Sequence, residues 1–179
     1  DPDLTHLDTA HGSLPLPAFL PDGTRAVVRC LDAADLEACG IRALMVNALH
    51  LSTAPGVSLV KQMGGIHGFM GWTGPVATDS GGFQVFSLAA TRKVDDDGVD
   101  FRSHVDGSAI RLTPERAMEV QEGLGADVAM CFDECPPSDA PRRDLLRAME
   151  RTTRWAERCL AAHSREDQAL FGIVQGGAD

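Results

Sequence analysis

The run Asp79-Ser80-Gly81-Gly82-Phe83 places a carboxylate, two glycines and an aromatic ring next to one another in the chain. Glycine lets a ligand approach the main chain closely, and backbone N–H groups exposed in this way can bind polar atoms. The flat face of an aromatic ring is a surface on which a base can stack. We therefore expect these residues to line a pocket for a planar ligand, with a helix cap followed by a turn as the alternative.

A second candidate site lies at Asp133, in the run Phe-Asp-Glu-Cys. An ionised carboxylate accepts two hydrogen bonds side by side, and guanine presents its N1–H and 2-amino group in line. Asp133 is therefore expected to recognise a guanine-like base, unless it only caps the loop before the next helix. Cys135 is placed in the same predicted site, with a small buried filler as the alternative.

The third candidate is Gln175, which two glycines follow. A carboxamide donates one hydrogen bond and accepts another, so Gln175 could read a carbonyl and an amine on one planar ligand. Gly176 is placed in the same predicted site, and a turn contact at a strand end is the alternative for Gln175. His104 and Asp106 could bind a metal or form a proton relay, but a turn at Asp106-Gly107 is the favoured interpretation of this pair.

Four short apolar runs alternate with helical stretches, which predicts βαβ units and a parallel sheet. The carboxyl ends of parallel strands meet on one face, where a (β/α)8 barrel has its active site. Each run is followed by a polar side chain, and these side chains are therefore expected to share one site. The runs span residues 43–46, 76–78, 127–132 and 170–174, and the polar residues are Asn47, Asp79, Asp133 and Gln175.

The predicted fold class is α/β, and the architecture is a (β/α)8 barrel of the TIM type. This chain is expected to form one domain over residues 1–179, covering about the first half of that barrel. Turn signals also predict an antiparallel hairpin insertion over residues 93–112. A doubly wound open sheet is the runner-up, although the Gly-x-Gly-x-x-Gly fingerprint of dinucleotide folds is missing.

Two further local features bear on this fold. The periodicity of residues 141–163 predicts a long amphipathic helix that buries Leu145, Met149, Ala156 and Leu160. The acidic run at residues 95–97 is expected to be a solvated loop tip.

The composition narrows the classes of function. The 179 residues include 26 acidic and 16 basic side chains, for a net charge of −10, which argues against gripping a nucleic-acid backbone by charge alone. Five cysteines with irregular spacing predict neither a disulfide framework nor a metal site in this chain, and favour a reducing cytoplasm. No apolar run is long enough to cross a membrane, so no membrane contact is expected.

Taken together, six stretches of the chain resemble the tRNA-guanine transglycosylases, which exchange guanine for a 7-deazaguanine in tRNA. They occur in the family's order over nearly the whole chain. They are GGIHGFMGW (64–72), TDSGGFQVFSL (78–88), SHVDG (103–107), LTPE (112–115), FDECP (132–136) and FGIVQGG (171–177).

The resemblance implies a role for each candidate residue. Asp79 would be the general base that takes a proton from the incoming base, and Phe83 would stack on that base. Asp133 and Gln175 would read its guanine-like edge. The implied reaction is base exchange at the anticodon wobble position on the path to queuosine. The implied partners are tRNA, guanine or 7-aminomethyl-7-deazaguanine, and a second copy in a homodimer.

The resemblance also implies what this chain lacks. The nucleophilic Asp, the Cys/His zinc site and the basic RNA-contacting surface of the family lie beyond residue 179. The isolated chain is therefore expected to be an inactive part of a pentosyltransferase, with no cofactor of its own. The family's Asn-Thr-Tyr-His stretch reads Asn47-Ala48-Leu49-His50 here. Two alternatives remain, a catalytically silent subunit that binds a base or a partner, and a barrel hydrolase with paired carboxylates.

Overall fold

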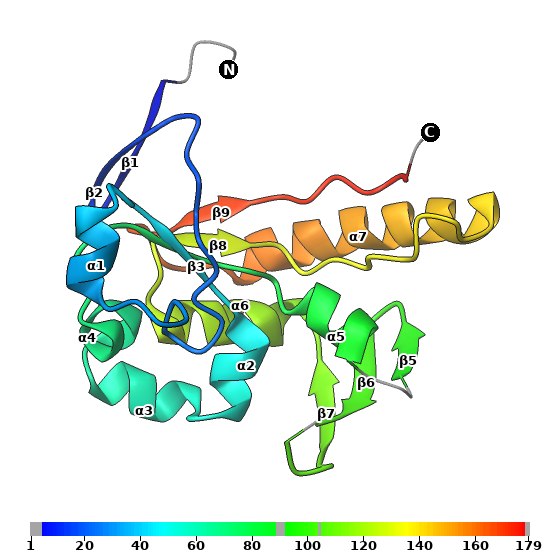
Figure 1. Ribbon diagram of the computed structural model, residues 1–179. Helices are drawn as coiled ribbons and strands as arrows, with labels where there is room; N and C mark the ends of the chain where they lie inside the picture. Colours follow the sequence, from blue (N-terminus) through cyan, green and yellow to red (C-terminus); the bar gives the residue numbers. More distant parts are fainter. Residues whose placement is uncertain (1–4, 89–91, 104, 178–179) are drawn as a thin grey trace. The chain divides into compact units, whose positions relative to one another are not determined.

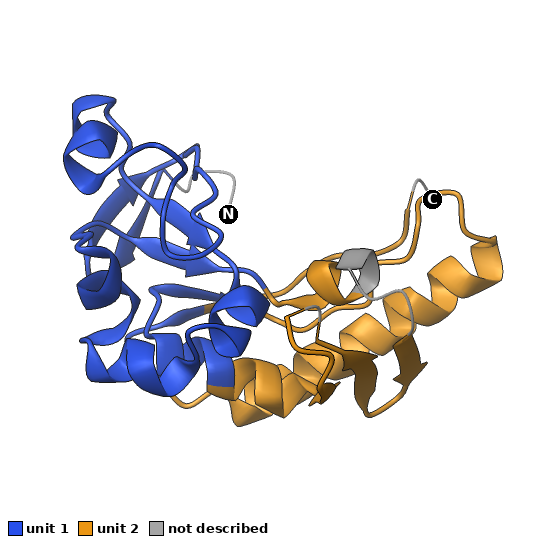
Figure 2. Ribbon diagram, turned by 60° about the horizontal axis from the view of Figure 1, so that its bottom comes forward, with its two compact units in different colours: residues 1–79, 120–129, 165–169 blue, residues 80–119, 130–164, 170–179 orange. Residues whose placement is uncertain are grey.

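The computed structural model describes residues 5–88, 92–103 and 105–177 (Figure 1). The chain divides into two compact units, which Figure 2 distinguishes by colour. Unit 1 comprises residues 1–79, 120–129 and 165–169, and unit 2 comprises residues 80–119, 130–164 and 170–179. The expectation of one domain over the whole chain stays a prediction.

The predicted parallel sheet is present (Figure 1). Its strands lie in the order β3 (Leu44–Val46), β4 (Val76–Thr78), β8 (Val128–Met130) and β9 (Ala169–Phe171). Parallel pairing joins β3 to β4 and β4 to β8. Each strand falls in or at the edge of one of the apolar runs. Most residues of β3, β4 and β8 are buried, whereas those of β9 are partly or fully exposed. The chain is therefore a mixed α/β protein with a parallel sheet.

Three of the four regular strands are shorter than the apolar runs that predicted them, and β4 matches its run. Asn47 and Asp79 directly follow β3 and β4, as expected. In contrast, β8 ends at Met130 and β9 at Phe171, so Asp133 and Gln175 lie in loops beyond the sheet. Their positions are consequently set by contacts other than the sheet ladder.

Unit 1 has a hydrophobic core of strand and helix residues. Pro55 indicates the start of a short helix over residues 55–63, and this helix is α3 (Val57–Gln62). Three further helices were not predicted, namely α1 (Ala33–Ala38), α2 (Ala48–Thr53) and α4 (Gly65–Met70). These helices have six residues each, too few for a clear helical period. The core is made mainly of Leu44, Val46, Leu51, Val60, Ile66, Val76 and Leu124.

Two other elements are a hairpin, which was not predicted, and a helix that a local signal indicates. An antiparallel hairpin of β1 (His6–Thr9) and β2 (Gly12–Pro15) lies near the N-terminus. The run Thr113-Pro114-Glu115 indicates a helix start, with Thr as cap, Pro at the first position and an acid in the first turn. Helix α6 (Pro114–Leu124) begins at this point. The Thr113 hydroxyl accepts a hydrogen bond from the Arg116 N–H (3.2 Å), which is the geometry of an N-cap.

The antiparallel insertion is also present, in unit 2. It is a three-stranded sheet of β5 (Arg92–Asp95), β6 (Gly98–Arg102) and β7 (Ala109–Leu112). His104 lies outside the described residues. The Asp106 carboxylate accepts hydrogen bonds from the N–H and hydroxyl of Ser108, as expected for a turn.

The long helix is α7 (Arg142–Ala162) of unit 2, but the prediction of its buried face was wrong. Its buried residues are Ala148, Thr152, Trp155 and Cys159, whereas Leu160 is 69% exposed. The buried face of α7 is determined by contacts with specific residues, which the hydrophobic pattern of the helix does not reveal. Trp155 stacks on Phe132 with ring centroids 4.7 Å apart, and the Thr152 hydroxyl serves as a hydrogen-bond acceptor.

The acidic run is more than a solvated tip, which corrects that expectation. Asp96 forms ion pairs with Arg151 and Arg154 of α7, both at 3.1 Å. Its carbonyl oxygen accepts a hydrogen bond from the indole N–H of Trp155 (2.8 Å). The turn between β5 and β6 is therefore attached to α7 within unit 2.

Candidate base-binding site

Asp79 is a half-buried carboxylate at the end of β4, held in place by the neighbouring strand end. The side-chain amide of Asn47 donates to one carboxylate oxygen, and the backbone N–H of Ala48 donates to the other (2.8 Å). Ala48 is the first residue of α2, so Asp79 also caps that helix across the sheet. The orientation of the carboxylate is thus fixed within unit 1. Asn47 is a partner that the sequence argument had noted only as a strand end.

Asp133 lies in unit 2 and is only 5% exposed. The hydroxyl of Ser80 donates to one carboxylate oxygen (2.7 Å), and the amide of Gln175 donates to the other (2.8 Å). Three of the predicted site residues are therefore in direct contact. Both donors are side chains, and a carboxylate oxygen can accept more than one hydrogen bond, so a ligand can still approach Asp133.

The ionisation of Asp133 reflects its burial. Burial raises the pKa of this carboxyl above its ordinary value, and the hydrogen bonds from Ser80 and Gln175 only partly oppose the rise. A partner that supplies further hydrogen bonds would stabilise the charged form. A perturbed carboxyl that faces polar side chains is typical of a binding or catalytic site.

The two glycines of the Ser-Gly-Gly run allow the main chain to lie close to Asp133. Gly81 has φ +78°, a backbone conformation that residues other than glycine rarely adopt. A Cβ atom on Gly82 would lie 2.6 Å from the carbonyl oxygen of Asp133, so no larger residue fits there. The N–H of Gly82 donates to the Ser80 hydroxyl (3.0 Å). Phe83 follows with 63% of its surface exposed, as a stacking platform requires.

Cys135, Gln175 and Gly176 line one cavity of about 350 Å³ in unit 2. Leu145 and Val174 supply apolar surface to the same cavity. Cys135 is partly exposed rather than fully buried, so the role of a buried filler does not describe it. A cavity of this volume is within the range of small-molecule sites.

The described structure thus brings together most of the predicted site within unit 2. Ser80, Gly82, Asp133 and Gln175 are linked by hydrogen bonds or close packing. Asp79 belongs to unit 1 and is connected to this group through its peptide bond with Ser80.

One residue of the same run was overlooked. Gln84 follows Phe83, and its side-chain oxygen is buried without a hydrogen-bond partner among the described residues. An unsatisfied buried acceptor is costly unless a ligand or water supplies a donor. Its place in the Asp-Ser-Gly-Gly-Phe-Gln run was the available signal.

The described residues contain one group with metal-type ligands, His11, His67 and Asp127 of unit 1. The two imidazole rings are stacked, with centroids 3.4 Å apart and an interplanar angle of 12°. Lone pairs of imidazole lie in the ring plane, so two nearly parallel rings cannot direct them at one ion. One nitrogen of each ring instead lies within hydrogen-bond distance of Asp127, Nδ1 of His11 at 2.8 Å and Nε2 of His67 at 3.0 Å. The group therefore fits a hydrogen-bonded cross-link and does not fit a zinc site.

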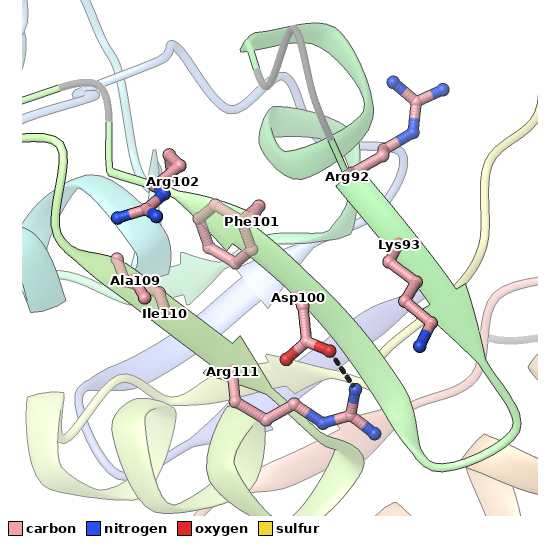
Figure 3. Close-up of a pocket in the computed structure, with 8 residues that line it drawn as sticks. All are labelled: Arg92, Lys93, Asp100, Phe101, Arg102, Ala109, Ile110 and Arg111. Carbon is pink, nitrogen blue, oxygen red and sulfur yellow. Dashed lines mark hydrogen bonds and ion pairs between the residues drawn. The ribbon is translucent and has the colours of Figure 1, made fainter.

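A second cavity in unit 2 is cationic. It is a groove of about 530 Å³ lined by residues of the β5–β7 sheet. Figure 3 shows Arg92, Lys93, Arg102 and Arg111 on these strands. Arg111 is paired with Asp100 (2.8 Å), which is the single acid of the lining, and with Asp95 (2.7 Å) outside the lining. The groove is thus locally positive in a chain whose net charge is −10, and it suits an anionic partner.

Among the described residues, every helix is too short or too polar to span a membrane.

Comparison with known proteins identifies the family of the chain. The family model described as "Queuine tRNA-ribosyltransferase" matches residues 3–179. Curated proteins of that name are 52% identical over 97% of this chain in Desulforamulus reducens, 56% over 94% in Gloeobacter violaceus and 55% over 97% in Thermus thermophilus. The matches cover 47%, 45% and 45% of those relatives, so the chain spans about half of their length. The chain belongs to the queuine tRNA-ribosyltransferase family.

Proposed function

We propose that this chain supplies the base-binding pocket and the general base of a tRNA-guanine transglycosylase. The reaction is exchange of guanine at the anticodon wobble position of tRNA for a 7-deazaguanine on the path to queuosine. The observation that carries the proposal is the buried Asp133 carboxylate, held between Ser80 and Gln175. Family membership supports the same activity.

Asp133 is the group that selects the base. Its two oxygens face two donors of guanine, N1–H and the 2-amino group, and the raised pKa of the free carboxyl is offset when these donors bind. Gln175 contributes one N–H and its carbonyl oxygen to the remaining polar atoms of the base. Phe83 covers the face of the ring, and Cys135 and Gly176 border the space beside Gln175.

Asp79 is the general base in this proposal. Its carboxylate is oriented by Asn47 and the Ala48 N–H, so it does not need to reorganise before accepting a proton. A positioned base contributes about 100- to 10,000-fold to a rate. Asp79→Asn should lower exchange within that range.

The remaining parts of the reaction lie outside residues 1–179. A carboxylate attacks the anomeric carbon of the ribose, guanine leaves, and the incoming base displaces the enzyme from the covalent intermediate. We assign that nucleophile, and a zinc site, to the rest of a (β/α)8 barrel whose first half is this chain. The isolated chain would then be inactive, and the complete protein a cytoplasmic homodimer that acts on tRNA.

The cationic groove supports a contact with RNA phosphates. Lys93→Gln with Arg102→Gln should weaken binding of an anticodon stem-loop and reduce its salt dependence by about one unit of slope per lost contact. Arg143→Gln with Arg147→Gln, on the exposed side of α7, is the matched control. Equal losses in both double variants would remove the groove from the proposal.

Calorimetric titration of free bases tests the pocket. Guanine should bind the chain roughly 10- to 100-fold more tightly than hypoxanthine, because hypoxanthine lacks the 2-amino donor and a hydrogen bond to a charged group contributes about 1.5–3 kcal/mol. Equal affinities would contradict the role of Asp133.

In this proposal, turnover also requires the nucleophile that we assign outside residues 1–179. A fusion in which this chain replaces the matching part of the Thermus thermophilus relative should incorporate labelled guanine into tRNA, and its Asp79→Asn variant should be strongly slowed. A folded fusion that binds guanine without turnover would favour the silent-subunit alternative.

A further inference from the structure

We propose that helix α7 is the positioning element of the base-recognition carboxylate, with Thr152 and Arg151 holding the residue next to Asp133. This inference rests on the proposed function, because it concerns how accurately Asp133 meets its base. Thr152 and Arg151 are not among the residues that line the cavity beside Gln175, so they act through Asp133 rather than on the ligand.

Asp133 lies beyond the last hydrogen bond of the sheet. Cys131 still donates to the carbonyl of Phe171 (2.8 Å), but the next N–H groups have other acceptors. The N–H of Phe132 donates to the Cys159 sulfur (3.3 Å), and that of Glu134 donates to the Thr152 hydroxyl (3.0 Å). Both acceptors are side chains of α7. The helix therefore accepts hydrogen bonds from the main chain just before and just after Asp133, where no neighbouring strand does so.

One face of α7 makes these contacts. Thr152 and Cys159 are separated by two helical turns, and Trp155 lies between them and stacks on Phe132 at 4.7 Å. Thr152 is 2% exposed, and Trp155 and Cys159 are fully buried. A buried hydroxyl on an otherwise apolar face has a defined use here, since it satisfies a main-chain donor that the sheet leaves unpaired.

Arg151 adds a charged contact at the same place. It donates to the Glu134 carboxylate (2.5 Å), and both side chains are largely buried, at 13% and 15% exposure. The same guanidinium also reaches Asp96 (3.1 Å), in the turn between β5 and β6. Glu134 is thereby held at its main chain by Thr152 and at its side chain by Arg151, and Asp133 is the residue before it.

The test is the ratio of guanine to hypoxanthine affinity, measured by calorimetry on the chain. A loss of folded protein lowers both affinities equally, whereas a displaced Asp133 mainly affects the base with the extra donor. A misplacement of a reacting group by about 1 Å can lower a catalysed rate about 100-fold. A smaller displacement of Asp133 should have a smaller effect on binding, so we expect Arg151→Ala and Thr152→Val to reduce the affinity ratio by roughly 3- to 10-fold. Arg151→Lys keeps one charged donor and should retain part of the ratio.

The chain offers matched controls on the same helix. Arg154 also pairs with Asp96 and has no contact with Glu134 among the described hydrogen bonds, and Thr153 is exposed and bonds to the carbonyl of Met149. Arg154→Ala and Thr153→Val should leave the ratio unchanged.

The outcomes separate this inference from the proposed function. Failure of the unaltered chain to prefer guanine would contradict the proposed function itself. A normal preference that stays unchanged in folded Arg151→Ala and Thr152→Val, with folding verified by thermal melting, would overturn the role of α7 and leave the pocket intact.

Discussion

Two buried aspartates, six positions apart in the sequence, have opposite environments. Asp127 of unit 1 is surrounded by fixed donors, since the N–H groups of His11 (3.2 Å) and Val76 (2.8 Å) point at it along with both imidazoles. Asp133 of unit 2 has two side-chain donors, Ser80 and Gln175. The first carboxylate is saturated by the fold, and the second retains capacity for a ligand.

Their pKa values move in opposite directions as a result. Burial raises the pKa of Asp127, but the hydrogen bonds from His67, the Val76 N–H and His11 outweigh this and hold it well below its usual value. Burial dominates at Asp133, and its pKa is raised. The comparison indicates that burial alone does not mark a functional carboxylate; the number of fixed donors around it distinguishes a structural cross-link from a binding group.

The largest effect expected from this comparison is a loss of folding stability on substitution of Asp127. Asp127→Asn replaces a fully bonded charge with an amide whose NH2 group faces donors, so unfolding in urea should require roughly 3–5 kcal/mol less free energy. Guanine affinity of the remaining folded protein should be unchanged. A stable variant that has lost guanine binding would reverse the roles assigned to the two aspartates.

Asp133→Asn should show the complementary behaviour. An amide presents one acceptor and one donor group to guanine instead of two acceptors, so affinity should fall by roughly 1.5–3 kcal/mol. Calorimetric titration measures the loss, and thermal melting should detect no destabilisation comparable with that of Asp127→Asn. Unaltered guanine affinity would remove Asp133 from base recognition.

The pH dependence of stability should differ in sign. The depressed pKa of Asp127 stabilises the fold above the unfolded pKa of about 3.9, and this is lost as the pH falls toward the folded value. The raised pKa of Asp133 favours the fold below about pH 3.9 and opposes it as the pH rises through the folded value. Urea unfolding from pH 3 to 7 should therefore show a flatter acid limb for Asp127→Asn. For Asp133→Asn the stability should improve selectively toward neutral pH, and parallel curves would contradict the comparison.

The smallest effect is expected at Phe83, which is exposed and free of strong packing. Phe83→Leu should change the free energy of unfolding by no more than about 0.5 kcal/mol, as is usual for surface substitutions. Guanine affinity should fall by roughly 1 kcal/mol, because stacking on an aromatic side chain contributes about 1–3 kcal/mol per base. An equal affinity would show that the ring does not cover the base.

Local sequence was a good guide to some of this arrangement. The apolar runs predicted the parallel strands, and the Thr-Pro-Glu and Asp-Gly signals predicted α6 and the antiparallel insertion. Asp133 and Gln175 were expected to share one site because each follows an apolar run, and their side chains are in contact. The hydrogen bond from Ser80 to Asp133 was not predicted from strand ends. The short helices were not predicted, because six residues carry little periodicity. The buried face of α7 was not predicted either, because it includes the polar residue Thr152.

Residue types and short-range spacing determined which side chains could do chemistry, because propensity, turns and strand ends are local properties. Only the tertiary structure decided which carboxylate is structural. His11 and Asp127 are separated by 116 positions, and Glu134 and Thr152 by 18. Such pairs form when the sheet and α7 close around them, and nothing in the neighbouring residues specifies the partner. The burial that raises the pKa of Asp133, and the donors that lower that of Asp127, exist only after the chain has folded.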